Sequence, residues 1–168
     1  LGSGWLTAHA PLGQQLRARV RHNRGFHLPD DDRPLILIGN GTGLAGLRSL
    51  LRARVTAGQS RNWLLFGERS AAHDFYCRDE LQGYLANGNL ARLDLAFSRD
   101  QAERVYVQQR LRAAADVLHS WVKEGAAIYI CGSLHGMAAE VDVVLREVLG
   151  EVTVQALVEA GRYRRDVY

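Results

Sequence analysis

Apolar and amphipathic stretches alternate along the chain from residue 35 onward. Four short, mostly apolar runs have the length of buried strands, and each is followed by a stretch in which apolar residues recur with helical spacing. Residues 162–168 finish the pattern as a fifth short strand. Most of these helical stretches close on a glycine, the residue that commonly follows the last helical turn. The pattern predicts strands at 35–39, 62–67, 90–98, 126–132 and 162–168, and helices at 44–58, 77–88, 105–125, 135–150 and 152–160.

This strict alternation predicts an α/β fold, a three-layer doubly wound five-stranded parallel sheet. Parallel strands need right-handed crossover connections, which place helices on both faces of the sheet. A chain of 168 residues, 47% of them apolar, can bury one sizeable core. In such a sheet, ligands bind outside the carboxyl ends of the strands, near the point where the strand order reverses. The residues that follow each predicted strand are therefore the candidate site.

The first 34 residues have a different pattern. Residues 16–21 alternate between apolar residues and arginine, which predicts a half-buried strand. Residues 27–34 are polar and contain two prolines, which indicates a connector. Because one strand cannot form a domain, we divide the chain into a first segment, 1–34, and a main domain, 35–168.

A glycine-rich segment, GNGTGLAG, follows the first predicted strand. Its Gly41, Gly43 and Gly46 fit the G-x-G-x-x-G pattern directly before a helix. Glycine lets the backbone approach a pyrophosphate closely, and the helix N-terminus supplies free N–H groups and a favourable dipole. Thr42 adds a hydroxyl group. A tight turn without a ligand is the alternative, but the position after the first buried strand of an alternating fold favours dinucleotide binding.

A second polar segment, SRDQAERVYVQ, follows the third predicted strand and brings a hydroxyl, two guanidinium groups, a phenol and an amide close together. Arginine binds phosphate through paired charge-assisted hydrogen bonds. A helix cap with solvated arginines is the alternative interpretation. The glycine-rich loop elsewhere at the same edge favours a phosphate site, whose residues are Ser98, Arg99, Arg104, Tyr106 and Gln108.

The ends of the second and fourth predicted strands leave two questions open. Glu68 lies where dehydrogenase-type folds carry an acid that holds the ribose 2′-hydroxyl of NAD, whereas the adjacent Arg69 favours the 2′-phosphate of NADP. The fourth strand ends with Cys131 and Gly132 at the same crevice. A cysteine there is either a small buried apolar residue or a part of the site.

Composition narrows the class of ligand. The net charge is +3 and Lys123 is the only lysine, which favours fixed arginine contacts to a small phosphate-bearing molecule and argues against nucleic acid. The two cysteines form no metal-ligand spacing, so we expect no metal and a reducing compartment. No apolar run is long enough to span a bilayer, and no signal-peptide pattern is present. We therefore expect a cytoplasmic protein in which residues 1–168 make no membrane contact.

Five motifs, in this order and spacing, resemble the NADP-binding domain of diflavin reductases: GNGTGLAG, FGER…DFYCRDEL, LDLAFSRDQAERVYVQ, IYICGSLHGMAAEV and GRYRRDVY. This family includes the flavoprotein subunit of sulfite reductase and lies within the ferredoxin-NADP reductase superfamily. The resemblance covers residues 35–168 and implies the NADP-binding domain of that superfamily. One departure is Asn40, which stands where the family commonly has proline.

The resemblance also accounts for the first segment. LGSGWL is similar to the family's Gly-x-x-Ser loop that holds the flavin pyrophosphate, with Ser3 as the matching residue. The strand at 16–21 would then be the last strand of the flavin barrel, and residues 1–34 its C-terminal remnant. The family's Arg-x-Tyr-Ser flavin motif would lie before residue 1, so the FAD-binding domain is an expected partner.

Carried over by position, the resemblance implies a set of cofactor-binding residues. One group holds the pyrophosphate and another holds the adenosine end, with Ser98 and Arg99 on the 2′-phosphate, which favours NADP over NAD. The set comprises Gly41, Thr42 and Gly43 for the pyrophosphate, Arg69, Ser98, Arg99, Arg104 and Tyr106 for the adenosine end, and Gln108, Gly132 and Met137 beside them.

The resemblance further implies three residues at the reacting end. Cys131 would lie against the nicotinamide, Asp166 would support the cysteine and the developing charge, and Tyr168 would stack on the flavin ring. The implied reaction is hydride transfer from NADPH to FAD, with electrons leaving singly through FMN in a flavodoxin-like domain or through another acceptor protein. A flavodoxin-like domain or a membrane anchor upstream stays open.

Three other functions are weighed against this one. The first is a regulatory module that binds NADP(H) without catalysis, for which a terminal aromatic residue such as Tyr168 has no evident use. The second is a flavin reductase that prefers NAD. The third is a self-sufficient nicotinamide dehydrogenase, which is disfavoured because the chain has no Tyr-x-x-x-Lys pair.

Overall fold

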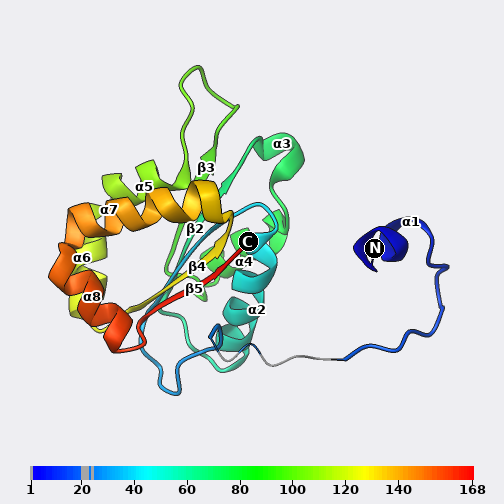
Figure 1. The fold of residues 1–168 in the computed structure, drawn as a ribbon, viewed down its shortest axis with the longest axis horizontal. Coiled ribbons are helices and arrows are strands. Elements are labelled where there is room, and N and C mark those ends of the chain that lie inside the picture. The colour runs from blue at the N-terminus through cyan, green and yellow to red at the C-terminus, as the bar shows by residue number, and fades with distance from the viewer. Residues whose placement is uncertain (1, 20–22, 24) are drawn as a thin grey trace.

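The computed structural model describes residues 2–19, 23 and 25–168, and its main body is a single parallel sheet covered by helices (Figure 1). All five predicted strands of the main domain are present. They are β1 (Leu35–Asn40), β2 (Asn62–Glu68), β3 (Arg92–Phe97), β4 (Ala127–Gly132) and β5 (Tyr163–Val167).

The helices of the main domain agree with the prediction except in three places, of which the first is a short helix, α3 (Ala71–Asp74), that was not predicted. The single helix expected at 105–125 is two helices, because the backbone leaves helical geometry at Ala114, with φ −102° and ψ 26°. A π-helical turn, η1, precedes α7 at the end of β4. No helix among the described residues is long and apolar enough to cross a membrane. The helices are α1 (Gly2–Ala8), α2 (Gly43–Thr56), α3 (Ala71–Asp74), α4 (Arg78–Ala86), α5 (Val107–Ala113), α6 (Ala115–Lys123), η1 (Leu134–Ala138), α7 (Ala139–Leu149) and α8 (Glu151–Glu159).

The strand order is β3-β2-β1-β4-β5, and every neighbouring pair is parallel. The chain builds outward from β1 to β3 and then crosses back to place β4 on the other side of β1. The strand order therefore reverses between β1 and β4, and a ligand crevice is expected at the carboxyl ends of these strands. This architecture confirms the predicted three-layer doubly wound parallel sheet.

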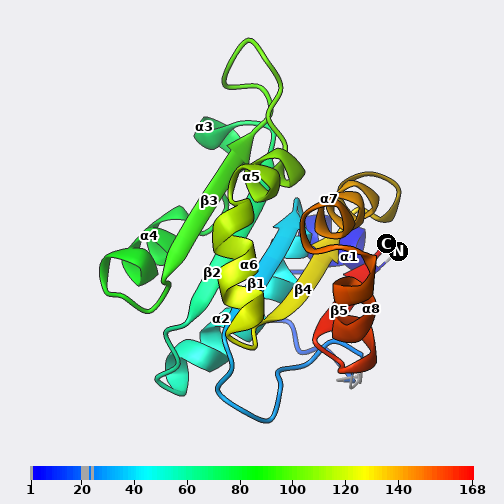
Figure 2. The ribbon, with the colours of Figure 1, turned by 90° about the vertical axis from the view of Figure 1, so that its left-hand side faces the viewer.

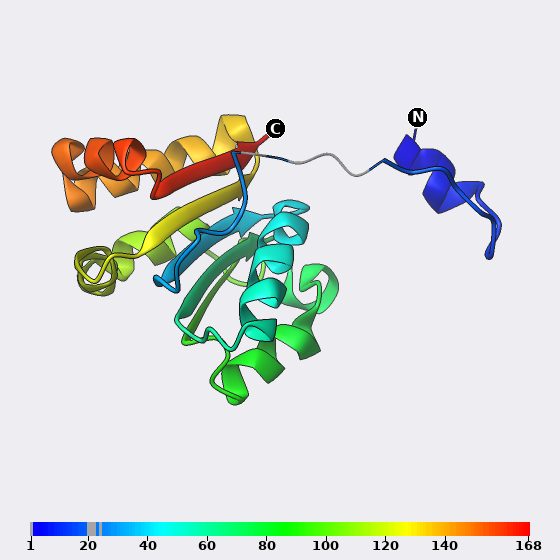
Figure 3. The ribbon, with the colours of Figure 1, turned by 90° about the horizontal axis from the view of Figure 1, so that it is seen from below.

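Two apolar clusters, one on each face, hold the helices to the sheet. Alternate residues of β1 point to opposite faces, so that Ile36 and Ile38 pack with α5 to α8 while Leu35 and Leu37 pack with α2 and α4. Figure 2 shows α5 and α6 lying across the strands on the first face, and Figure 3 shows the layers edge-on. All four of these β1 side chains are fully buried, as expected for a parallel sheet covered on both faces.

The first segment differs from the prediction. Residues 16–19 have no regular structure and are exposed, and residues 20–22 lie outside the described part of the chain. The strand prediction at 16–21 was therefore wrong over 16–19, where no described neighbour supplies the hydrogen bonds that a strand needs. The expected Gly-x-x-Ser loop is also a helix here, since Ser3 lies within α1. Figure 1 shows α1 standing away from the sheet.

The connector before β1 packs on the main domain from Phe26 onward. Phe26 is 9% exposed and meets the ring of Tyr129 edge to face, with ring centroids 5.3 Å apart. The Tyr129 hydroxyl donates a hydrogen bond to the carbonyl oxygen of His27 at 2.7 Å. These contacts join residues 26–28 to the α2 face of the sheet, although the boundary between residues 34 and 35 stays a prediction.

Phe26→Ala tests whether this connector is a part of the folded domain. We expect a loss of about 3 kcal/mol in the free energy of unfolding, because the substitution removes a buried ring from the cluster around Tyr129. Leu16→Ala is the matched control, since Leu16 is half exposed and should change stability by less than about 0.5 kcal/mol. Chemical denaturation measures both values, and equal values would contradict the packing described.

Candidate functional site

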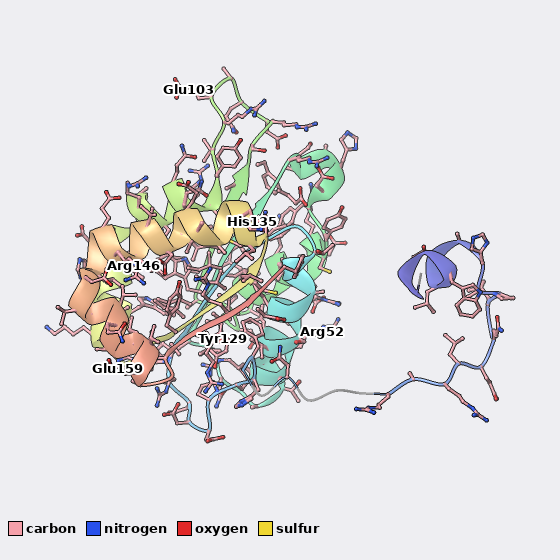
Figure 4. All side chains as sticks on the ribbon, in the orientation of Figure 1. Arg52, Glu103, Tyr129, His135, Arg146 and Glu159 are labelled. Atoms are coloured by element: carbon pink, nitrogen blue, oxygen red, sulfur yellow. The ribbon has the colours of Figure 1, made fainter. Side chains whose placement is uncertain are left out.

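A cavity of about 480 Å³ opens at the carboxyl ends of β1, β2, β3 and β4. The loop that follows β3 forms one wall and projects from the sheet, with Glu103 at its tip (Figure 4). The start of α7, beside His135, forms the other wall. The cavity is lined by Asn40, Gly67, Glu68, Arg69, Ala96, Ser98, Arg99, Arg104, Tyr106, Val107, Gln108, Ser133, Gly136, Met137 and Glu140.

The predicted phosphate-binding residues come together in this cavity. The hydrogen bonds between β2 and β3 continue past the strand ends, because Ser98 N–H donates to the Glu68 carbonyl at 2.9 Å and Arg99 N–H donates to the Arg69 carbonyl at 2.8 Å. Backbone pairing thus fixes Arg69 and Arg99 beside each other. The lining includes every residue of the predicted adenosine end together with Gln108 and Met137.

Three guanidinium groups in the cavity have no carboxylate partner among the described residues. Arg69, Arg99 and Arg104 make no side-chain hydrogen bond or ion pair there, whereas Arg48, Arg52 and several others are paired with acids. Like charges held in one cavity repel one another, so a bound anion lowers the energy of the cluster. The guanidinium fork binds phosphate through paired charge-assisted hydrogen bonds, so a phosphate group suits this cluster.

Glu68 separates this arginine cluster from the glycine-rich loop. One carboxylate oxygen, Oε2, accepts a hydrogen bond from the Arg69 N–H at 2.8 Å. The other, Oε1, lies 3.4 Å from the place that a Cβ on Gly41 would occupy. An acid is therefore present beside the loop, where a ribose hydroxyl could meet it, and the geometry includes groups suited to either nicotinamide cofactor.

The glycine-rich loop is required for packing, which the sequence did not reveal. A Cβ on Gly39 would lie 2.5 Å from the carbonyl oxygen of Cys131, and a Cβ on Gly43 would lie closer still. Gly41 has φ +54°, a left-handed conformation that favours glycine. Gly41, Thr42 and Gly43 are not among the residues that line the cavity. The loop lies beside the cavity, and Gly39 and Gly43 allow the backbone of this segment to approach β4.

Asn40 connects this loop to the end of β4. Its Oδ1 accepts a hydrogen bond from the Ser133 N–H at 3.1 Å. Gly132 has φ +139°, and a Cβ there would overlap Asn40 Oδ1. In the sequence, Asn40 is visible only as a departure from a family pattern, because its contact with Ser133 depends on the β1–β4 register.

The three residues predicted at the reacting end lie next to the cavity rather than in its lining. Cys131 and Asp166 are direct neighbours in the β4–β5 register, and Cys131 is 3% exposed. Burial, and then the charge of Asp166, raises the pKa of the Cys131 thiol to about 11. The thiol is therefore protonated at neutral pH.

Tyr168 extends beyond β5 over the end of β4. Its N–H donates to the Gly132 carbonyl at 3.1 Å, and its carbonyl oxygen accepts from the Leu134 N–H at 3.0 Å. The Tyr168 hydroxyl forms a hydrogen bond with Thr42 Oγ1. The C-terminal tyrosine and the glycine-rich loop are thus in contact, while the Tyr168 side chain remains largely exposed.

Several lining residues were not predicted. Gly136 and Glu140 belong to the π-helical turn and to α7, where helical spacing places Glu140 one turn after Met137 and Gly136. That spacing was a usable signal. Gly67 and Val107 contribute backbone and apolar surface, for which the sequence gives no chemical signal. Among the described residues no cluster of three or more His, Cys, Asp or Glu side chains could hold a metal.

Gly43→Ala tests the close approach of the loop to β4. The new methyl group would overlap the Cys131 carbonyl, so we expect a loss of about 2 kcal/mol or more in the free energy of unfolding. Gly83→Ala is the matched control, because Gly83 lies in α4 with open space around it and alanine there should increase stability by about 0.5–1 kcal/mol. Opposite signs of the two changes in thermal or chemical denaturation are the expected result, and equal signs contradict the packing.

The two thiols should differ in reactivity. Cys131 is buried and has a raised pKa, whereas Cys77 is partly exposed. Reaction with a disulfide reagent at pH 8 should show one fast thiol that Cys77→Ser removes and Cys131→Ser leaves unchanged. Two equally fast thiols would contradict this arrangement.

The buried Cys131 thiol should also make stability depend on pH. Because folding raises the pKa of Cys131 from 9.0 to about 11, its contribution to the free energy of unfolding should fall as the pH rises above about 9, where the unfolded thiol ionises.

Comparisons with known proteins agree with the resemblance stated from the motifs. Residues 37–143 match the model of the oxidoreductase NAD-binding domain. Over 99% of its length, the chain is 42% identical to the sulfite reductase [NADPH] flavoprotein alpha-component of Vibrio vulnificus, 43% identical to that of Vibrio cholerae and 39% identical to that of Yersinia pestis. The chain spans 29% of the length of each of these relatives. The family match covers more than half of the chain and fits the observed sheet, and the chain therefore belongs to the oxidoreductase NAD-binding domain family.

Proposed function

We propose that this domain binds NADPH and positions its nicotinamide for hydride transfer to FAD, from which electrons leave singly through FMN in a flavodoxin-like domain or through another acceptor protein. The observation that carries the proposal is the cluster of three guanidinium groups without carboxylate partners in one cavity at the carboxyl edge of the sheet. The names of the relatives, which contain NADPH and flavoprotein, support the same cofactors.

The adenosine end of NADPH fits the cavity between β2 and the loop after β3. A 2′-phosphate is a dianion, and the Ser98 hydroxyl with Arg99 and Arg104 offers it neutral and charged donors in one place. Arg69 lies beside Arg99 through backbone pairing and adds a third positive charge. Tyr106 is 41% exposed at the same wall and is available to stack on the adenine.

The nicotinamide end is assigned to the side of the crevice formed by β4 and β5. Cys131, Asp166 and Tyr168 come together there with Thr42. Because the Cys131 thiol is protonated at neutral pH, it acts as a neutral neighbour of the nicotinamide ring and not as a base. Tyr168 offers an exposed aromatic ring for stacking on the flavin.

The residues of this chain contribute orientation, and the cofactors carry the redox chemistry. FAD, when bound, supplies the acceptor for the hydride of NADPH. Arg99 and its neighbours anchor the far end of the nucleotide, which restricts where the nicotinamide can lie. Ser3 is proposed to contact the flavin pyrophosphate, and residues 1–34 to belong to the FAD-binding barrel. The FAD-binding domain is then the immediate partner, and neither a nucleic acid nor a membrane is a proposed partner of residues 1–168.

A flavin reductase that prefers NAD is the second candidate, and Glu68 is the observation that favours it. Its carboxylate lies against Gly41, where it could accept a hydrogen bond from a ribose hydroxyl. The cavity lining holds two acids, Glu68 and Glu140, and three arginines without carboxylate partners, and this balance favours NADP. The two candidates make opposite predictions for Arg99.

Arg99→Ala should remove most of the preference for NADP⁺ over NAD⁺. We expect the unaltered chain to bind NADP⁺ at least tenfold more tightly, about 1.4 kcal/mol, and the variant to lose most of this gap because a charged contact to the 2′-phosphate is missing. Arg61→Ala is the matched control, since Arg61 pairs with Glu124 at the amino ends of the strands, at the other end of the sheet from the cavity. Calorimetric titration with both nucleotides measures the four affinities.

The outcomes separate the candidates. Equal or tighter binding of NAD⁺ by the unaltered chain, with no effect of Arg99→Ala, would favour Glu68 as the ribose ligand and contradict the NADP assignment. No binding of either nucleotide would contradict the proposal for this domain as it stands. A loss in Arg61→Ala equal to that in Arg99→Ala would show a general charge effect instead of a phosphate contact.

A further inference from the structure

Asn40 is the last residue of β1, the central strand of the sheet, and it lines the cavity. Its neighbours are the ends of the two adjoining strands. The Cβ of Asn40 lies close to Gly67 at the end of β2, and its Oδ1 is bonded to Ser133 just after β4. The side chain therefore occupies the middle of the carboxyl edge.

The hydrogen bond to Ser133 fixes which way the Asn40 amide points. The Ser133 N–H is a donor, so the atom that receives it at 3.1 Å must be the amide oxygen. The nitrogen, Nδ2, must then lie on the other side of the amide. The left-handed backbone of Gly132 lets Oδ1 approach closely, since a side chain there would overlap it. The orientation of Asn40 is thus determined by the backbone around β4.

The Nδ2 group of Asn40 is a free donor. Among the described residues none accepts a hydrogen bond from it, and it is not one of the buried side-chain nitrogens that lack a partner. This nitrogen therefore keeps some exposure, and the cavity is the open space that Asn40 lines. A fixed neutral amide therefore offers its N–H groups to a ligand in the cavity.

The glycine-rich loop supplies fewer donors than its sequence promises. The Gly41 N–H already donates to the Gly67 carbonyl at 3.2 Å, and Gly41, Thr42 and Gly43 lie outside the cavity lining. The Thr42 hydroxyl is bonded to Tyr168. A donor from the cavity lining would therefore add to the N–H groups of Thr42 and Gly43, for which the described residues supply no acceptor.

We propose that Asn40 Nδ2 donates a hydrogen bond to the pyrophosphate of the bound nucleotide, an inference that rests on the proposed NADP site. Ser98 directly follows β3 and Asn40 ends β1, and these two strands are separated by two strand spacings, roughly 10 Å. If the 2′-phosphate lies at Ser98 and Arg99, the adenosine ribose leads from there toward β1 and brings the pyrophosphate to Asn40. Asn40 is a binding residue here and holds its position through Ser133.

Two substitutions of Asn40 test the proposal with two ligands. Asn40→Asp keeps an acceptor for Ser133 but replaces the donor with a negative charge, and Asn40→Ala removes the donor without adding charge. NADP⁺ contains the pyrophosphate, whereas adenosine 2′-monophosphate carries only the phosphate assigned to Arg99. We expect NADP⁺ binding to weaken at least tenfold in Asn40→Asp and about fivefold or more in Asn40→Ala, with adenosine 2′-monophosphate binding unchanged within twofold.

Controls make the result specific to Asn40. Asn87→Asp adds the same charge at the exposed end of α4 and should leave both affinities unchanged. Thermal denaturation of each variant reports whether the fold is intact. Arg99→Ala should weaken both ligands, which is the opposite pattern to the Asn40 variants.

Each remaining outcome overturns a defined statement. Unchanged NADP⁺ binding in Asn40→Ala overturns the proposed hydrogen bond. Equal losses for the two ligands, with a lower melting temperature, overturn it in favour of a purely structural Asn40. Failure of the unaltered chain to bind NADP⁺ overturns the proposed function as well, and this is distinguished from the first two because it does not depend on any substitution.

Discussion

At the end of β1 the backbone passes so close to β4 that neither Gly39 nor Gly43 has room for a Cβ beside the carbonyl oxygen of Cys131. The strand order reverses at this contact, and the crevice opens above it. The same approach brings Asn40 within hydrogen-bond distance of Ser133. The position of α2, the exit of β4 and the floor of the cavity therefore depend on one backbone contact, which explains why a small change in this loop should affect the whole site.

Most of the fold could be predicted because its signals are local. The strands β1, β2 and β4 are apolar runs of the right length, and β3 alternates apolar and charged residues. The β5 strand is mostly charged and was placed by its position after the last helix. The break at Ala114 could not be predicted, since it lies among three consecutive alanines that all favour helix. The strand expected at 16–21 is absent over 16–19, the described part of that segment, because no neighbour is available. Alternation of apolar and charged residues allows a strand, but a strand forms only where a neighbour supplies hydrogen bonds.

In the candidate site, too, residues with a local sequence signal could be predicted and residues that depend on distant contacts could not. Ser98 and Arg99 were predicted because they follow directly from the end of a strand, and local spacing was enough to place them at the carboxyl edge. Asn40 was not assigned a role, because its contact joins residues 93 positions apart and depends on the register of β1 against β4. The glycines of the loop were predicted as a site for the pyrophosphate, and the structure gives them a second role in packing. Their pattern indicated a loop around a pyrophosphate, and the geometry shows in addition that the loop must be small to pack on β4.

Charge is distributed unevenly along the crevice, and this distribution matches the proposed orientation of the nucleotide. The end at β2 and β3 is open and holds three arginines without acid partners, so it favours a phosphate dianion. The end at β4 holds a buried thiol whose pKa is raised to about 11, so this side chain stays uncharged at neutral pH. A nicotinamide cofactor has the same asymmetry, with phosphates at one end and a reactive ring at the other. Asn40 lies between the two ends with a neutral donor, where it can meet a phosphate without adding charge next to the reacting ring.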